Sequence, residues 1–192
     1  MKDVKILIIS GLFLMTQFFA SAQAKFSATA VNTSVTGTST LHDWEMKSAA
    51  ANCAVTATVD ASGNITAINA MKFAISAKSL KSGKGAMDKN AYKALKADAH
   101  PNIIADLKSA KVSSKDNVNY TVNATVALNI AGKTKDTDMV VTMKKVNANS
   151  FSVSTKKKIA MSEYGVEPPS FMMGTVTTGN EVDLAFNFNI TK

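Results

Sequence analysis

The sequence contains no arginine, and all 22 of its basic residues are lysines. Base readout in nucleic acids and two-pronged binding of phosphate rely on the planar guanidinium group, which lysine does not replace. The formal net charge of +8 is spread along the chain apart from one run at residues 156–158. We therefore expect no nucleic-acid partner. A solvated strand face explains the lysines better than attraction to anionic lipid, and peripheral contact with a membrane stays open.

Cysteine and histidine are also scarce. Cys53 is the only cysteine, so neither an intramolecular disulfide nor a thiolate metal cluster can form. It falls on an apolar strand face, where a thiol behaves as a small hydrophobic group. His42 and His100 are the only candidate bases at neutral pH, and no HExxH, GxSxG or phosphate-loop motif accompanies them. We expect His42 to bond backbone at a turn and His100 to lie beyond a helix end. The sequence predicts a protein that is not an enzyme and holds no metal or cofactor.

The N-terminal residues have the features of a signal peptide. Two lysines precede an apolar run over residues 6–20, and small residues then form an A-x-A pattern that ends at Ala22. The run is shorter than the roughly 20 residues that cross a bilayer, and no basic cluster follows it. We expect residues 1–22 to be removed, leaving residues 23–192 as one domain in the periplasm or outside the cell.

Beyond residue 25 the hydrophobic period is two. Apolar and polar residues alternate over 118–130 and 182–191, which is typical of antiparallel strands with one dry face. Further strands are expected at residues 26–32, 34–40, 45–59, 64–77, 139–146 and 150–161. About eight strands at short spacing predict an all-β fold. An antiparallel β-barrel is favoured over a sandwich because closure removes exposed sheet edges.

Two segments break this period. Met87, Ala91 and Leu95 recur every four residues within 86–96, which predicts one short amphipathic helix. Segment 167–174 contains two consecutive prolines and cannot lie inside a strand, because proline donates no ladder hydrogen bond. It should be a loop or a single helical turn that carries large apolar residues.

A binding function would use the inside of the barrel, which is just wide enough for one small ligand at eight strands. Small residues on the predicted inward faces leave volume unfilled: Ala49, Ala51, Ala57 and Ala124. The helix and the 167–174 segment could close the mouth. We expect these side chains to line the site: Trp44, Phe73, Met87, Tyr92, Leu95, Phe171 and Met172.

Two alternatives stay open at this point. Lys78, Lys81 and Lys84 either meet an acidic headgroup or are solvated loop charges. The barrel is either hollow, with flexible methionines that adapt to a long apolar chain, or filled, with the same residues serving as core.

Four segments, in this order, carry a family resemblance: STLHDW at 39–44, the stretch from Met87 to Ile103, LNIAGKTK at 128–135 and PPSFMMG at 168–174. They resemble the YceI-like family, also called polyisoprenoid-binding-like proteins, from about residue 25 to 191. The resemblance implies an elongated lipocalin-like barrel with a pocket for isoprenoid or fatty-acyl amphiphiles, exported in Gram-negative bacteria. Family members are associated with isoprenoid-quinone metabolism, transport or storage, and with stress responses.

The sequence thus predicts an exported protein that holds a polyisoprenoid or fatty-acyl lipid in its barrel for transport or storage. The alternative is a periplasmic stress or structural protein whose barrel is filled and whose outer surface binds a partner. Whether the chain forms a homodimer is left open.

Overall fold

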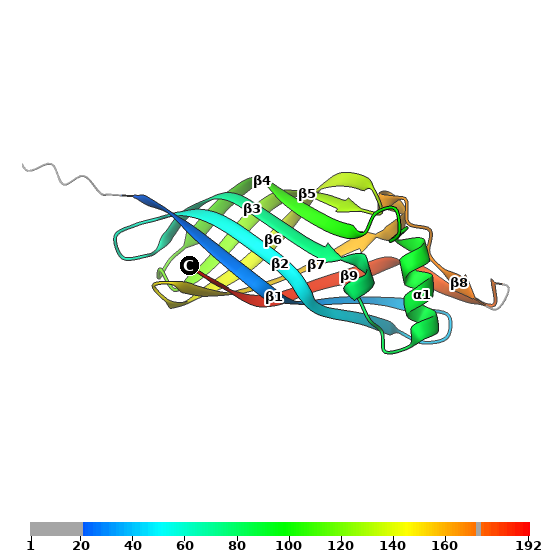
Figure 1. The fold of residues 1–192 in the computed structure, drawn as a ribbon. Helices are drawn as coiled ribbons and strands as arrows, with labels where there is room; N and C mark the ends of the chain where they lie inside the picture. The colour runs from blue at the N-terminus through cyan, green and yellow to red at the C-terminus, as the bar shows by residue number, and fades with distance from the viewer. Residues whose placement is uncertain (1–20, 172–173) are drawn as a thin grey trace, which may run out of the picture.

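The computed structural model describes residues 21–171 and 174–192. Figure 1 shows an elongated barrel with a helix across one end. Within the described residues the chain forms nine strands, one α-helix and two 3₁₀ turns, in this order: β1 (Ala22–Ser39), β2 (Trp44–Val59), β3 (Ile65–Ser76), a 3₁₀ turn (Ala77–Ser79), α1 (Gly85–Ala94), β4 (Asn102–Ser114), β5 (Asn119–Ile130), β6 (Lys133–Asn147), β7 (Ser150–Ala160), a second 3₁₀ turn (Met161–Tyr164), β8 (Ser170–Phe171) and β9 (Val176–Thr191).

The barrel closes because its first and last long strands pair. Neighbouring strands follow the chain from β1 to β7, β7 then pairs with β9, and β9 returns to β1, all antiparallel. The pair Val35↔Leu184 is part of this closing ladder. The short β8 pairs only with the start of β9. This confirms the predicted all-β, lipocalin-like antiparallel β-barrel of about eight strands with one short amphipathic helix.

Two strands that the sequence predicted separately form a single strand in the structure. Residues 26–32 and 34–40 belong to the single strand β1, whose pairing with β2 shifts register between Ala28 and Val31 and again between Val31 and Thr33. The first of these shifts places an extra residue in β1, which reverses its side-chain alternation and hides the continuity of the strand. The sequence-based prediction also omitted β4, which has few buried positions and therefore a weak alternating pattern.

The second register shift, between Val31 and Thr33, corrects the predicted inward face of β2. Ala51 and the alternate residues after it are buried, but Ala49 is exposed. Val31 pairs with Ala51 and Thr33 with Ser48, so β2 carries one extra residue in this interval. Residues before the bulge therefore point to the opposite side from the one that strict alternation predicts.

The two segments that break the strand period lie at the same end of the barrel (Figure 1). Helix α1 confirms the helix predicted at 86–96 and ends slightly earlier, because Lys96 has a left-handed φ of 51°. Segment 167–174 was expected to be a loop or a single helical turn; residues 167–169 are loop, and Ser170 and Phe171 form β8 directly after the prolines. Met172 lies outside the described residues.

The opposite end of the barrel is filled. Phe151 is fully buried and contacts two other rings edge-on, those of Phe26 at 5.6 Å and Tyr120 at 5.8 Å between centroids. Across this end, Lys145 Nζ donates to Ser62 O at 2.9 Å and to Asn64 Oδ1 at 2.7 Å. The loop between β2 and β3 is thereby tied to β6, and space for a ligand is confined to the remainder of the barrel.

Of the helices among the described residues, none combines the length and hydropathy that crossing a bilayer requires. The predicted signal sequence falls mainly on residues 1–20, outside the described part, and its cleavage after Ala22 stays a prediction. That cleavage would leave nearly all of β1, which begins at Ala22.

Candidate functional site

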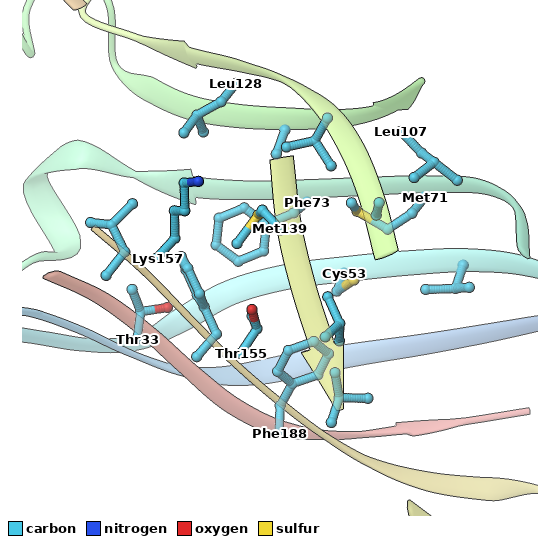
Figure 2. Close-up of a pocket in the computed structure, with 18 of the residues that line it drawn as sticks. Thr33, Cys53, Met71, Phe73, Leu107, Leu128, Met139, Thr155, Lys157 and Phe188 are labelled. Carbon is cyan, nitrogen blue, oxygen red and sulfur yellow. The ribbon is translucent and has the colours of Figure 1, made fainter. Parts of the chain in front are cut away.

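An inner cavity of about 150 Å³ lies in the middle of the barrel (Figure 2). Inward-facing side chains of all eight barrel strands line it, and nearly all of these are apolar. Phe73 and Phe186 form an edge-on aromatic pair in its wall, with ring centroids 5.2 Å apart. Ala105 and Ala124 occupy positions where larger side chains would fill the space. Of the small residues predicted to leave this volume, Ala124 lines it.

A larger cavity of about 400 Å³ lies between the open end of the barrel, α1 and the β8–β9 hairpin. Apolar side chains dominate its lining, and the helix supplies Met87, Ala91, Ala94 and Leu95. This outer cavity adjoins the inner one, since five side chains line both: Val35, Leu80, Ile103, Ile130 and Leu184. The barrel is therefore filled at one end and hollow from its middle to the helix.

Polar contacts fix helix α1 to the segment that precedes it. The Tyr92 hydroxyl donates to the carbonyl oxygens of Lys78 and Leu80, at 3.0 and 2.8 Å. Asp88 Oδ1 accepts hydrogen bonds from the backbone N–H and the hydroxyl of Ser82, at 2.8 and 2.7 Å. These bonds to the charged form lower the pKa of the Asp88 carboxyl. The apolar face of the helix packs against the core at this end of the barrel and covers the cavity.

Trp44 forms one side of the outer cavity. Its indole Nε1 donates to Thr38 O at 3.0 Å, which fixes the ring across β1. The ring lies over Gly37, where a Cβ atom would fall within 2.8 Å of the indole Cε2. A glycine is needed at that position for the tryptophan to lie flat on the strand. As the only tryptophan of the chain, Trp44 is also a built-in reporter of this cavity.

The structure brings together five of the seven residues predicted to line the site. Trp44, Met87, Leu95 and Phe171 line the outer cavity, and Phe73 lines the inner one. Tyr92 lines neither, and its hydroxyl instead donates to the backbone carbonyls of Lys78 and Leu80. Met172 lies outside the described residues.

The three lysines named as headgroup candidates have different surroundings. Lys78 is paired with Asp98 at 2.6 Å, and Lys81 lies 3.9 Å from Asp88 and over the ring of Tyr92. Lys84 lines the outer cavity. Sequence reasoning missed Lys157, which lines the inner cavity. The signal was present, since Lys157 shares the alternate positions of β7 with buried apolar residues.

The three residues considered from the sequence as a possible nucleophile or base, Cys53, His42 and His100, have separate surroundings. Burial raises the pKa of the Cys53 thiol to about 11, which leaves it protonated at neutral pH. His42 Nδ1 lies 2.7 Å from the Asp43 carbonyl oxygen, the backbone partner expected at a turn, and the His100 ring lies over Gly132. Among residues 21–171 and 174–192, no three His, Cys, Asp or Glu side chains are grouped to hold a metal ion.

Comparison with known proteins identifies relatives of this architecture. The family model of the YceI-like domain matches residues 44–190. Among solved structures, BcnA from Burkholderia cenocepacia is similar at a TM-score of 0.64 and 15% identity, over 84% of this chain and 96% of that one. A polyisoprenoid-binding domain from Saccharophagus degradans, implicated in plant cell wall breakdown, is similar at a TM-score of 0.59 and 12% identity, over 91% and 99%.

A third solved structure, the Campylobacter jejuni YceI protein, is similar at a TM-score of 0.52 and 17% identity, over 73% of this chain and 81% of that one. At these identities the likeness establishes a shared fold. No curated protein matches the chain.

Proposed function

The chain belongs to the YceI-like family, and from this premise we propose that it is an exported carrier of a long-chain isoprenoid or fatty-acyl lipid. The observation that carries the proposal is the pair of adjoining cavities, the larger about 400 Å³ and lined almost wholly by apolar side chains. Small-molecule pockets are typically about 300–1,000 Å³, mostly apolar and largely pre-formed. The name of the Saccharophagus domain as polyisoprenoid-binding supports the same ligand class.

The shape of the site favours a flexible chain over a compact ligand. The cavities follow one another along the barrel, so a ligand that fills both must be elongated. Met71, Met139 and Met143 in the inner lining and Met46, Met87 and Met161 in the outer one give walls that adapt to a bending chain. The proposal contains no catalytic step, because transport or storage needs only reversible burial of the lipid.

The proposal includes the location. A carrier of this kind works where the predicted signal peptide, residues 1–22, would direct it, in the periplasm or outside the cell. N-terminal sequencing of the protein from its native host tests this part: a mature chain that begins within two residues of Gln23 supports it, and retention of Met1 contradicts it.

Binding can be measured by Trp44 fluorescence with saturated and unsaturated chains of increasing length. Each buried methylene contributes about 0.8 kcal/mol, so each two-carbon extension should tighten Kd by up to about fifteenfold until the cavities are full. Beyond that length the affinity should level off. Affinity that does not depend on chain length, or no binding at any length, contradicts the proposal.

A pair of variants on α1 makes the test specific to the cavity. Ala91→Phe adds a ring to the lining of the outer cavity, whereas Lys93→Phe adds the same ring to the exposed side of the helix. We expect the first variant to shift the plateau to shorter chains and the second to leave it unchanged.

A further inference from the structure

One cation belongs to the wall of the hollow region. Lys157 lies on the inward face of β7, in alternation with the buried residues Val153, Thr155 and Ile159. In the ladder between β7 and β9, Lys157 pairs with Leu184, which lines both cavities. Figure 2 shows the Lys157 side chain among those that line the inner cavity. Lys157 is thus located where the two cavities meet.

Lys157 has no anionic partner in the described part of the chain. Its sequence neighbour Lys158 pairs with Glu181 at 3.3 Å, and Lys135 on the adjacent strand pairs with Glu163 at 2.6 Å. No such contact, and no hydrogen bond, reaches the Lys157 ammonium from residues 21–171 or 174–192. The Lys157 residue is half-buried beside an apolar wall, and an ammonium that loses water there needs an acceptor or a counter-charge.

The barrel wall beside Lys157 is interrupted, which gives its ammonium a route to water. The ladder between β6 and β7 ends at Val141↔Thr155, although both strands continue past that pair. Lys157 lies two residues beyond Thr155, the last β7 residue of this ladder. Its methylenes can therefore line the cavity while the ammonium stays near the interruption in the wall, as long cationic side chains do at apolar surfaces.

We propose that Lys157 binds the carboxylate of a long-chain fatty acid or a similar single-chain acid, with the apolar chain running through the outer cavity towards Trp44 and α1. This inference rests on the proposed carrier function. One unpaired ammonium matches one negative charge, which favours a carboxylate over a phosphate monoester carrying nearly two. The outer cavity, at about 400 Å³, is the one large enough for the chain.

The two threonine hydroxyls in the same lining do not compete with Lys157 as donors to an acidic group. Thr155 donates to Val140 O at 2.9 Å, and Thr33 donates to Val31 O at 3.4 Å. Both line the inner cavity with Lys157. Since their protons are directed at backbone carbonyls, the ammonium is the principal donor available to a carboxylate at this point.

The decisive experiment compares head groups in variants of two adjacent lysines. Lys157→Met keeps the unbranched stem and removes the charge, and Lys156→Met makes the same change on the exposed side of β7. Binding of oleate, oleyl alcohol and oleyl phosphate is followed by Trp44 fluorescence. Lys157→Met should weaken oleate by about tenfold, the scale of one charge-assisted hydrogen bond. It should leave oleyl alcohol within about twofold, and Lys156→Met should change neither.

Two further variants of Lys157 complete the experiment. Lys157→Arg should restore the preference for oleate, and Lys157→Gln serves in place of methionine where that variant fails to fold. An unchanged ratio of oleate to oleyl alcohol affinity in Lys157→Met overturns the assignment of Lys157, as does a wild type that prefers oleyl phosphate. Failure of the wild type to bind oleate and oleyl alcohol alike would instead overturn the carrier function itself.

Discussion

Replacing Met87 with aspartate perturbs the helix face that covers the outer cavity. Met87 is half-buried and lines this cavity from α1. Full burial of a methionine side chain contributes about 1.5–3 kcal/mol, so losing its contact with a ligand should weaken binding by roughly 10- to 150-fold. A carboxylate facing the apolar chain adds to this loss, because a ligand would have to desolvate it.

The same substitution should have little effect on folding. The hydrogen bonds of the Tyr92 hydroxyl and the Asp88 carboxylate, which hold α1 to the segment before it, do not involve Met87. We expect the free energy of unfolding of the empty protein to fall by less than about 1 kcal/mol. Thermal unfolding followed by circular dichroism measures this quantity, and titration of Trp44 fluorescence with a long-chain lipid measures binding.

Lys89→Asp is the matched control, since Lys89 is exposed on the same helix. A Met87→Asp variant that binds like this control would refute the reasoning that α1 covers the ligand. A variant that unfolds instead would show that Met87 is part of the core, as in a filled barrel.

Three further predictions concern the walls of the site. Gly37→Ala should displace the Trp44 indole, change its emission spectrum and weaken lipid binding, because a Cβ atom at residue 37 overlaps the ring; an unchanged spectrum would contradict this. Cys53, with its pKa raised to about 11 by burial, should react with thiol reagents at pH 8 far more slowly than a free thiol, and rapid labelling of the folded protein would count against a closed lumen. The lowered pKa of Asp88 means that its contribution to stability is present above the ordinary carboxyl pKa and is lost as pH falls through the folded value; Asp88→Asn should remove this acid sensitivity of unfolding, measured by melting from pH 6 to pH 3.

Strands with strict alternation were predictable from the sequence because one wet face and one dry face specify them. Residues 118–130 form β5 almost as predicted. The bulges near Val31 were not predictable, because an extra residue in one strand is a tertiary feature that interrupts the period without a compositional mark. β4 was missed because most of its residues are exposed or half-buried, so its sequence shows only a weak alternation of apolar and polar residues.

The site was predictable where bulky apolar residues interrupt a strand pattern. Met87, Leu95 and Phe171 were identified in this way and meet in the outer cavity. Tyr92 was grouped with them as an aromatic residue, but the direction of its hydroxyl depends on carbonyls of a distant turn. Lys157 was missed because a run of three lysines suggests a solvated face, whereas alternation turns the middle one inward.

The most direct test of the carrier function is native mass spectrometry of protein purified gently from its own host, without detergent. A lipid carrier predicts a peak heavier than the mature chain by a few hundred daltons, which disappears after organic extraction and returns on incubation with the extracted lipid. Unmodified apo mass in all three samples, with Trp44 fluorescence unaltered by the extract, would contradict lipid binding in the barrel.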